Sequence, residues 1–165
     1  MNYLDLTIRE MHQALVEGKV TPEELTLEAL KRAKENQDNA FETIMEEQAL
    51  ADARALKEVE VDNPFWGIPV VVKDNFSTKD VLTTASSEIL KDYVPVFDAT
   101  VVKKLKEAHA IIIAKSTLDE LAMGGTGTTG HLGTTYNPYD PKHERIIGGS
   151  SCGSAVSVAA GIVPF

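Results

Sequence analysis

The sequence has 165 residues, 43 % of them hydrophobic, so it can bury a core, and its composition is not that of a low-complexity or disordered chain. Its formal charge of −9 at pH 7 disfavours a large nucleic-acid footprint, because binding phosphates needs clustered Lys and Arg side chains. One cysteine excludes an internal disulfide, and neither a signal-peptide pattern nor an apolar run of about 18 residues occurs, so we expect a cytoplasmic protein without a membrane span.

Helix signals dominate the first 60 residues. Capping-box spacings after Thr7 and after Thr21 predict two helices with one apolar face each. A short strand over residues 41–45 and an alanine-rich, charged helix over residues 46–59 follow. Because this stretch carries no cluster of chemically reactive side chains, we expect residues 1–60 to be an N-terminal helical segment that serves as a preface or a docking surface.

The composition changes after residue 60. Residues 67–72 are apolar and β-branched, which predicts a buried strand that runs into Lys73. Residues 98–108 predict a helix capped by Asp98, and residues 110–114 predict a second buried strand that ends at Lys115. Strand, helix and strand in this order predict a parallel crossover unit, so we expect an α/β fold in which helices flank a mixed sheet.

A glycine-rich run, GGSSCGS at residues 148–154, is followed by small and apolar residues that predict a helix to Gly161. Glycine lets main-chain N–H groups crowd around a ligand, and the start of a helix adds a positive dipole end. The run is therefore compatible with an anion site and equally with an ordinary tight loop that caps a buried helix. A Gly/Thr-rich segment over residues 124–149 precedes it and is long for an unstructured loop, which favours a functional role.

Lys73 is the candidate base. At the end of a buried strand its side chain can be an ordinary ion-paired lysine beside Asp74, or burial can lower its pKa and make a general base available near neutral pH. A serine hydroxyl needs such a base, and Ser–Lys pairs are a known variant of nucleophilic catalysis. The spacing alone does not bring Lys73 and the serines together.

Several separated motifs resemble the amidase signature family, with the closest likeness to its branch of A subunits of tRNA-dependent amidotransferases. Their order and spacing match along the whole chain. The motifs are GIPVVVKDN at 67–75, DATVV at 98–102, DELAMG at 119–124, GGSS at 148–151 and GSA at 153–155.

The resemblance implies a Ser–cis-Ser–Lys triad. By this resemblance Lys73 is the base, Ser150 is the bridging serine held by a cis peptide bond, and Met123 and Gly124 contribute to the substrate site. It also implies that the nucleophilic serine and the oxyanion hole belong to a later Gly-Gly-Ser motif, about two dozen residues after Ser150. We therefore expect residues 61–165 to be the N-terminal part of a truncated amidase domain that is inactive alone.

For the complete protein the resemblance implies hydrolysis of glutamine, with the released ammonia used to convert Glu-tRNA(Gln) to Gln-tRNA(Gln). The B and C subunits of the amidotransferase are the implied partners, tRNA is implied only through the partner subunit, and ATP and Mg²⁺ are expected there, with no cofactor or metal in this chain. Three departures stand out: Cys152 and Ile147 in the glycine-rich motif, and the absence of a glutamate from residues 126–129. The last leaves open a stand-alone amidase that hydrolyses small amides.

Other interpretations remain open. One is a phosphate-binding loop, although the glycine-rich run at residues 148–154 lacks the Gly-Lys-Ser/Thr ending that such loops have. Another is a non-catalytic interaction module that docks on a partner through the N-terminal helices. Cys152 is either a nucleophile near a helix start or a small packing residue, and Met123 is either core filler or a pocket wall. The Asp119–Glu120 pair is expected to decorate a helical turn that starts near Ser116. The four histidines show no metal-ligand spacing and are expected on the surface or in loops: His12, His109, His131 and His143.

Overall fold

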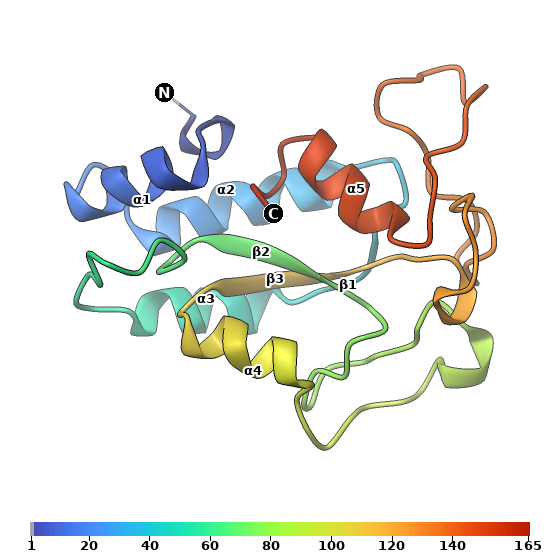
Figure 1. The fold of residues 1–165 in the computed structure, drawn as a ribbon, viewed down its shortest axis with the longest axis horizontal. Coiled ribbons are helices and arrows are strands. Elements are labelled where there is room, and N and C mark those ends of the chain that lie inside the picture. Colours follow the sequence, from blue (N-terminus) through green and yellow to red (C-terminus); the bar gives the residue numbers. More distant parts are fainter. Residues whose placement is uncertain (1) are drawn as a thin grey trace.

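The computed structural model describes residues 2–165, and Figure 1 shows helices packed around a small central sheet. The α-helices are α1 (Ile8–Val16), α2 (Pro22–Glu35), α3 (Glu46–Ala55), α4 (Thr100–Glu107) and α5 (Cys152–Ala159). The strands are β1 (Phe41–Ile44), β2 (Pro69–Lys73) and β3 (Ile111–Ser116). Three short 3-10 turns are η1 (Tyr3–Asp5), η2 (Glu88–Leu90) and η3 (Glu120–Ala122).

Both predicted capping boxes are present. The hydroxyls of Thr7 and Thr21 accept the N–H of the third helical residue, and Glu10 and Glu24 return the bond to the cap backbone. The prediction of a third helix over residues 46–59 is wrong at its C-terminal end. Helix α3 stops at Ala55, and the chain continues in an extended conformation from Leu56. That extended stretch allows the main-chain oxygen of Glu60 to lie 3.1 Å from a ring nitrogen of His12.

The sheet has the order β1-β3-β2. Strands β2 and β3 are parallel, with Pro69 opposite Ile111 and Lys73 opposite Ser116, and α4 forms the connection between them, so the predicted crossover unit is confirmed. Strand β1 pairs with β3 in the antiparallel direction, which makes the sheet mixed, as expected. Lys73 and Ser116 therefore lie side by side at the end of the two parallel strands.

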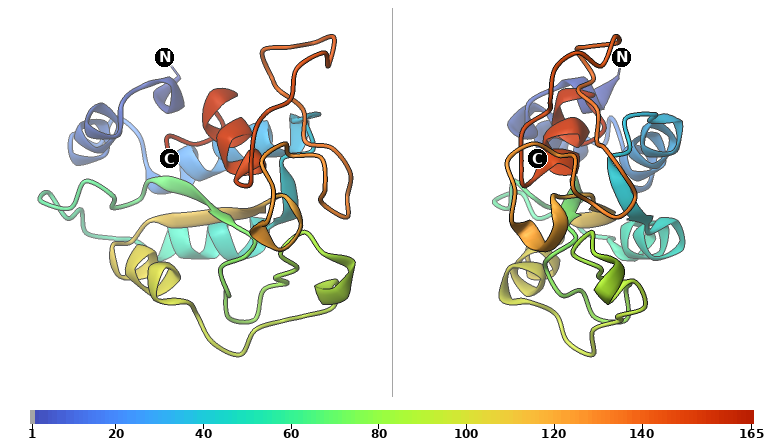
Figure 2. Two further views of the ribbon diagram at one scale, coloured as in Figure 1. Left: turned by 45° about the vertical axis from the view of Figure 1, so that its right-hand side comes forward. Right: turned by 90° about the vertical axis from the view of Figure 1, so that its right-hand side faces the viewer.

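Helices cover both faces of the sheet. In Figures 1 and 2, α2 and α5 lie on one side of the sheet and α4 on the other. One core cluster joins α1, α2 and α3 to Ile111, Ile113 and the residues after α5, and a second joins Val102 of α4 to Val70 and Val72 of β2. The first cluster contains side chains from both sides of residue 60, so the N-terminal helices share a core with the sheet. Within residues 2–165 no helix has both the length and the apolar character to cross a membrane.

Two local predictions need correction. The helix α4 begins after Ala99 without a side-chain cap, because the Asp98 carboxylate instead accepts the N–H of Lys79 at 2.7 Å and pairs with Lys106 at 2.8 Å. The helical turn expected from Ser116 is displaced along the chain: Ser116 still belongs to β3, and the turn is the short η3 with Leu121 in a left-handed conformation. Residues 124–149 are irregular apart from one bridge between Tyr136 and Ile146.

Candidate active site

Lys73 and the serines of the glycine-rich run meet at the end of β2. The Lys73 Nζ donates to the Ser150 Oγ at 2.7 Å and to the Ser151 Oγ at 2.9 Å. The peptide bond between Gly149 and Ser150 is cis, as the family resemblance implies. A lysine amine in contact with two hydroxyls is an arrangement through which a proton can move between serine and lysine.

The packing of α5 on the sheet sets this geometry. Helix α5 contacts β2 and β3, and the Ser154 Oγ of its first turn lies 2.7 Å from the Ser116 Oγ of β3. At Gly153 the helix backbone comes so close to Thr117 that a Cβ would lie 2.5 Å from the Thr117 Oγ1, and only glycine fits. The Gly153 N–H donates to the Thr117 main-chain oxygen at 3.1 Å, so this amide is already used within the protein. That pairing argues against a phosphate cradle at the start of α5.

Burial is the main influence on Lys73. Its side chain is partly enclosed, which lowers the pKa of its amine below the usual value, and the negative charge of Asp119 opposes this effect. The alternative of an ion pair with Asp74 is wrong, because Asp74 pairs with Lys115 at 2.9 Å on fully buried side chains. Lys73 therefore faces hydroxyl groups, and within residues 2–165 no carboxylate forms an ion pair with it.

The two residues that the resemblance adds lie in the loop after η3. The Met123 side chain is 83 % exposed, so the interpretation as core filler is wrong, and neither Met123 nor Gly124 is among the hydrogen-bond partners of Lys73 or Ser150. Gly124 lies against Asp119, whose side chain a Cβ at residue 124 would meet at 2.5 Å. Asp119 thus lies against both Gly124 and Gly149 of the glycine-rich run.

Several side chains are placed differently from the expectation. Asp119 directly precedes the short turn η3, but its carboxylate is fully buried and bound by the loop over residues 126–129 and not by that turn. His12 is not on the surface but 8 % exposed in α1. Cys152 is buried and donates to the Thr135 Oγ1 at 3.4 Å, which agrees with the packing interpretation. Within residues 2–165 no group of three or more His, Cys, Asp or Glu side chains is arranged to hold a metal ion.

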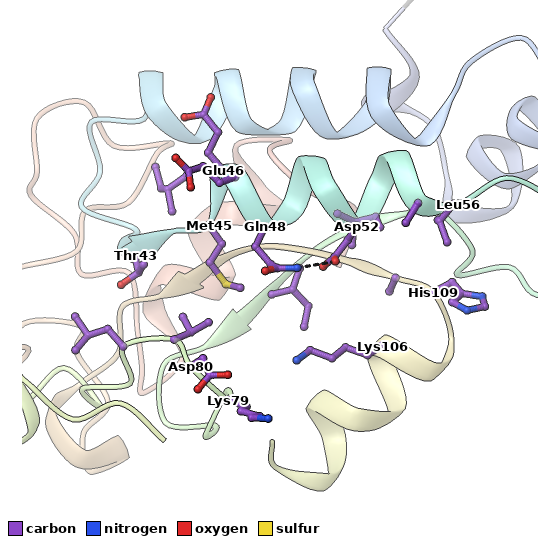
Figure 3. Close-up of a pocket in the computed structure, with 18 residues that line it drawn as sticks. Thr43, Met45, Glu46, Gln48, Asp52, Leu56, Lys79, Asp80, Lys106 and His109 are labelled. Carbon is purple, nitrogen blue, oxygen red and sulfur yellow. Dashed lines mark hydrogen bonds between the residues drawn. The ribbon is translucent and has the colours of Figure 1, made fainter. Parts of the chain in front are cut away.

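A separate groove of about 1020 Å³ lies between α3 and α4 (Figure 3). Its lining includes Met45 and the first residues of β3, together with charged side chains from both α3 and α4. Figure 3 shows Gln48 bonded to Asp52 on α3, with Lys106 reaching out from α4. Neither Lys73 nor Ser150 lines this groove, so the reactive side chains lie elsewhere.

Comparison with known proteins identifies the family. Residues 24–165 match the family model described as Amidase. The chain belongs to the amidase family. The matched region includes all of β2, the loop over residues 124–149 and α5, and therefore both Lys73 and Ser150.

Relatives within the amidase family carry the names of different enzymes. The A subunit of glutamyl-tRNA(Gln) amidotransferase from Streptococcus pneumoniae (strain Hungary19A-6) is 46 % identical over 99 % of this chain and 34 % of its own length. The crystal structure of the subunit of the same name from Thermotoga maritima is 41 % identical with a TM-score of 0.77, covering 99 % of this chain and 33 % of that one. Native peptide amidase from Stenotrophomonas maltophilia is 28 % identical with a TM-score of 0.86, covering 98 % and 35 %. The chain thus spans about a third of the length of the curated relatives it matches.

Sequence reasoning missed Ser151 and Asp119 as members of the site. Two sequence features pointed to Ser151: it is the second serine of the glycine-rich run, and it directly precedes α5, at the N-cap position. Asp119 begins the motif DELAMG, but the motif did not indicate its role, because the groups that bind its carboxylate lie seven to ten residues further along an irregular loop.

Proposed function

We propose that this chain supplies the lysine and the bridging serine of an amidase centre, in which Lys73 is the base and Ser150 carries the proton between Lys73 and a nucleophilic serine outside residues 1–165. The single observation that carries the proposal is the contact of the Lys73 Nζ with the Ser150 Oγ at 2.7 Å. Membership of the amidase family supports it, because the matched region contains both residues.

The proposed chemistry follows from the properties of the two groups. Burial lowers the pKa of Lys73, so a larger fraction of its amine is neutral near pH 7 and able to accept a proton. Ser150 passes its own proton to Lys73 as it takes the proton of the attacking serine, which forms an acyl-enzyme and releases ammonia from the amide. The stored proton leaves with the ammonia, and water then hydrolyses the ester. Ser151 accepts a hydrogen bond from the Lys73 Nζ and orients its amine.

For the complete protein we propose the role of the A subunit in a tRNA-dependent amidotransferase. Glutamine would be the amide donor, the B and C subunits the partners, and ATP and Mg²⁺ would act in the partner subunit that binds tRNA. The 46 % identity to the Streptococcus pneumoniae protein over almost the whole chain supports this role. The cytoplasm would be its compartment.

A second candidate is a stand-alone amidase that acts on small amides without partner subunits. Two observations favour it: the loop over residues 126–129 lacks a carboxylate, and the peptide amidase has a higher TM-score than the Thermotoga maritima amidotransferase protein, 0.86 against 0.77. The two candidates share the Lys73 and Ser150 chemistry and differ in the acceptor of the ammonia.

A chimera tests both candidates. Residues 1–165 are joined to the remaining two thirds of the Streptococcus pneumoniae protein, and the chimera is produced with the B and C subunits of that organism. We expect glutamine hydrolysis that Lys73→Ala or Ser150→Ala lowers by about 10³-fold or more, since members of a catalytic unit act together. The exposed Lys103→Ala in α4 is the matched control and should keep full activity.

Three results separate the possibilities. Full activity in the Lys73→Ala and Ser150→Ala chimeras would refute the proposed centre. Turnover of small amides by the chimera without the B and C subunits, together with failure to amidate Glu-tRNA(Gln), would favour the stand-alone amidase. The 165-residue chain by itself should release no ammonia from glutamine, and turnover abolished by Ser150→Ala would contradict the external nucleophile.

A further inference from the structure

Asp119 is a fully buried carboxylate held by one loop. Its Oδ1 accepts the N–H groups of Gly127, Thr128 and Thr129 at 3.0, 3.2 and 3.4 Å, and the Thr129 hydroxyl at 3.0 Å. Its Oδ2 accepts the N–H groups of Gly127 and Thr126 at 3.0 and 3.2 Å. Among residues 2–165 no Lys, Arg or His side chain forms an ion pair with Asp119. The loop amides and one hydroxyl therefore satisfy this buried charge, as in the main-chain nests that bind anions.

Ionisation of Asp119 is consistent with this arrangement. Burial alone raises the pKa of a carboxyl group, but the hydrogen bonds from Gly127, Thr129 and Thr126 outweigh it and hold the pKa of Asp119 below its usual value. Hydrogen bonds to an ionised group are stronger than those between neutral groups. We therefore expect removal of the Asp119 carboxylate to release the loop over residues 126–129.

The same residue touches the glycine-rich run. The Asp119 N–H donates to the main-chain oxygen of Ser150 at 3.0 Å. Its Oδ2 lies directly over Gly149, where a Cβ would overlap it, and a Cβ there would also meet the Thr126 nitrogen at 3.1 Å. The Gly149–Ser150 peptide is thus in contact with both the carboxylate and the main chain of Asp119, next to the hydroxyl that Lys73 contacts.

We propose that Asp119 is a positioning residue, which clamps the loop over residues 126–129 onto the Gly149–Ser150 peptide and so keeps the Ser150 hydroxyl against Lys73. This inference rests on the proposed function for its meaning, because Ser150 matters only as the bridge to Lys73. Asp119 itself touches neither Lys73 nor a reacting atom. Asp119 contributes by keeping Ser150 in position and by keeping the Lys73 amine enclosed.

The test measures ionisation and amide exchange in the 165-residue chain and does not need activity. Lysine labelled with ¹³C at Cε gives the Lys73 pKa by NMR titration, with the Lys73→Met variant assigning the signal. In Asp119→Ala we expect the Thr128 and Thr129 amides to exchange roughly tenfold faster or more. Asp119→Ala and Asp119→Asn both remove the negative charge that raises the Lys73 pKa, so their difference isolates the loss of enclosure. The Lys73 pKa should be higher in Asp119→Ala than in Asp119→Asn, because burial is the largest cause of its depression.

Asp119→Asn is the conservative variant and covers the case in which Asp119→Ala does not fold. One amide oxygen can still accept the bonds made to Oδ1, so Thr128 and Thr129 should stay protected and the Lys73 pKa should stay low. The Thr126 amide, which is bonded only to Oδ2, should exchange faster. Asp140→Ala is the matched control, because Asp140 is also buried and binds a loop amide, that of Arg145, without touching Gly149 or Ser150.

The proposal is wrong if a folded Asp119→Ala variant has the same Lys73 pKa as Asp119→Asn, or if Asp140→Ala raises the Lys73 pKa above the wild-type value by as much as the difference between those two variants. It is also wrong if Asp119→Asn leaves Thr126 exchange unchanged. Each of these outcomes is independent of the chimera assay. Loss of the proposed amidase function therefore leaves the positioning result standing, and failure of the positioning result leaves the amidase assay to be judged by itself.

Discussion

The Nζ of Lys73 and the Oγ of Ser150 lie 2.7 Å apart, although 77 positions separate the two residues in the chain. One sits at the last residue of a strand and the other just before α5. The docking of α5 on β2 and β3 brings them together, so the geometry of the pair reports on that docking. Any change that lifts α5 from the sheet is expected to separate them.

The partial burial of Lys73 predicts a pH-dependent stability. Its pKa is lowered in the folded chain, so the unfolded chain holds the proton more tightly, and an ionised Lys73 destabilises the fold at pH 7. This cost disappears as the pH rises through the folded pKa toward the usual value near 10.5. Relative to Lys73→Met, the wild type should therefore gain on the order of 1 kcal/mol of unfolding free energy between pH 7 and pH 10.

Urea unfolding at the two pH values measures this gain. The exposed Lys103→Met in α4 is the control, and its difference from the wild type should not change with pH. A difference between the wild type and Lys73→Met that stays constant from pH 7 to pH 10 would show that Lys73 is not desolvated.

The buried ion pair of Lys115 and Asp74 predicts a large loss of stability when one partner is removed. Both side chains are fully buried at 2.9 Å, and the Lys115 Nζ also donates to the Thr83 Oγ1 at 2.8 Å and the Phe76 main-chain oxygen at 3.1 Å. Lys115→Met leaves Asp74 charged without a partner, which costs about 3–5 kcal/mol. Urea unfolding should show this loss, with Lys103→Met within about 0.5 kcal/mol of wild type.

Adding Asp74→Asn to Lys115→Met should recover part of the loss. The Asn oxygen still accepts the Thr84 N–H and hydroxyl that Asp74 holds at 2.7 Å, and the uncompensated charge is gone. A double variant as unstable as the single one would mean that lost packing around Lys115, and not the buried charge, determines the cost.

Local signals account for the parts of the fold that the sequence predicted. Capping boxes mark the starts of α1 and α2, and apolar β-branched runs mark β2 and β3. The end of α3 carried no such signal, because the backbone becomes extended at Leu56 and no Gly or Pro stands at that position or directly after it.

The site was predictable only through the family resemblance. Nothing in the spacing of Lys73 and Ser150 places them together, since the contact depends on the register of β2 and the docking of α5. The Asp119 clamp was not predictable at all, because hydrogen bonds from an irregular loop leave no period in the sequence. The pairing of His131 with Glu42 across 89 positions is of the same kind.

His131 predicts a second pH dependence, of opposite sign. Its Nε2 lies 3.0 Å from Glu42 of β1 and its Nδ1 3.4 Å from Glu88 of η2, and Glu88 also pairs with Lys91. Burial of the ring lowers the pKa of His131, but Glu42 and then Glu88 outweigh it, so the pKa is raised above the usual 6.5. The stabilisation is complete below pH 6.5 and is lost as the pH rises through the folded pKa.

The wild type should therefore lose about 1 kcal/mol relative to His131→Gln between pH 6 and pH 9. Urea unfolding at both values measures the difference. His143→Gln is the matched control, since His143 is an exposed loop histidine with no carboxylate within ion-pair distance among the residues described. If the unfolding free energies of His131→Gln and His143→Gln depend on pH in the same way, His131 is not the cause of the effect.

Gly153 predicts how tightly the site depends on the docking of α5. A Cβ at residue 153 would overlap the Ala40 main-chain oxygen and would lie 2.5 and 2.6 Å from the Oγ1 and nitrogen of Thr117. These are mostly backbone atoms that cannot move aside, so Gly153→Ala should push the start of α5 away from the sheet at a cost of about 1–3 kcal/mol or more. Ser150 and Ser151 would move with it, and the Lys73 pKa should rise toward its usual value as water enters.

Gly125→Ala is the matched control, because a Cβ there meets nothing within 4 Å. Urea unfolding and the ¹³C titration of Lys73 are measured on both variants. If Gly153→Ala loses stability but keeps a low Lys73 pKa, the enclosure of the amine does not depend on α5. The contact between Lys73 and Ser150 would then have to be maintained by the Asp119 clamp alone. In that case the Lys73 pKa should be higher in the double variant of Gly153→Ala with Asp119→Ala than in the double variant of Gly153→Ala with Asp119→Asn.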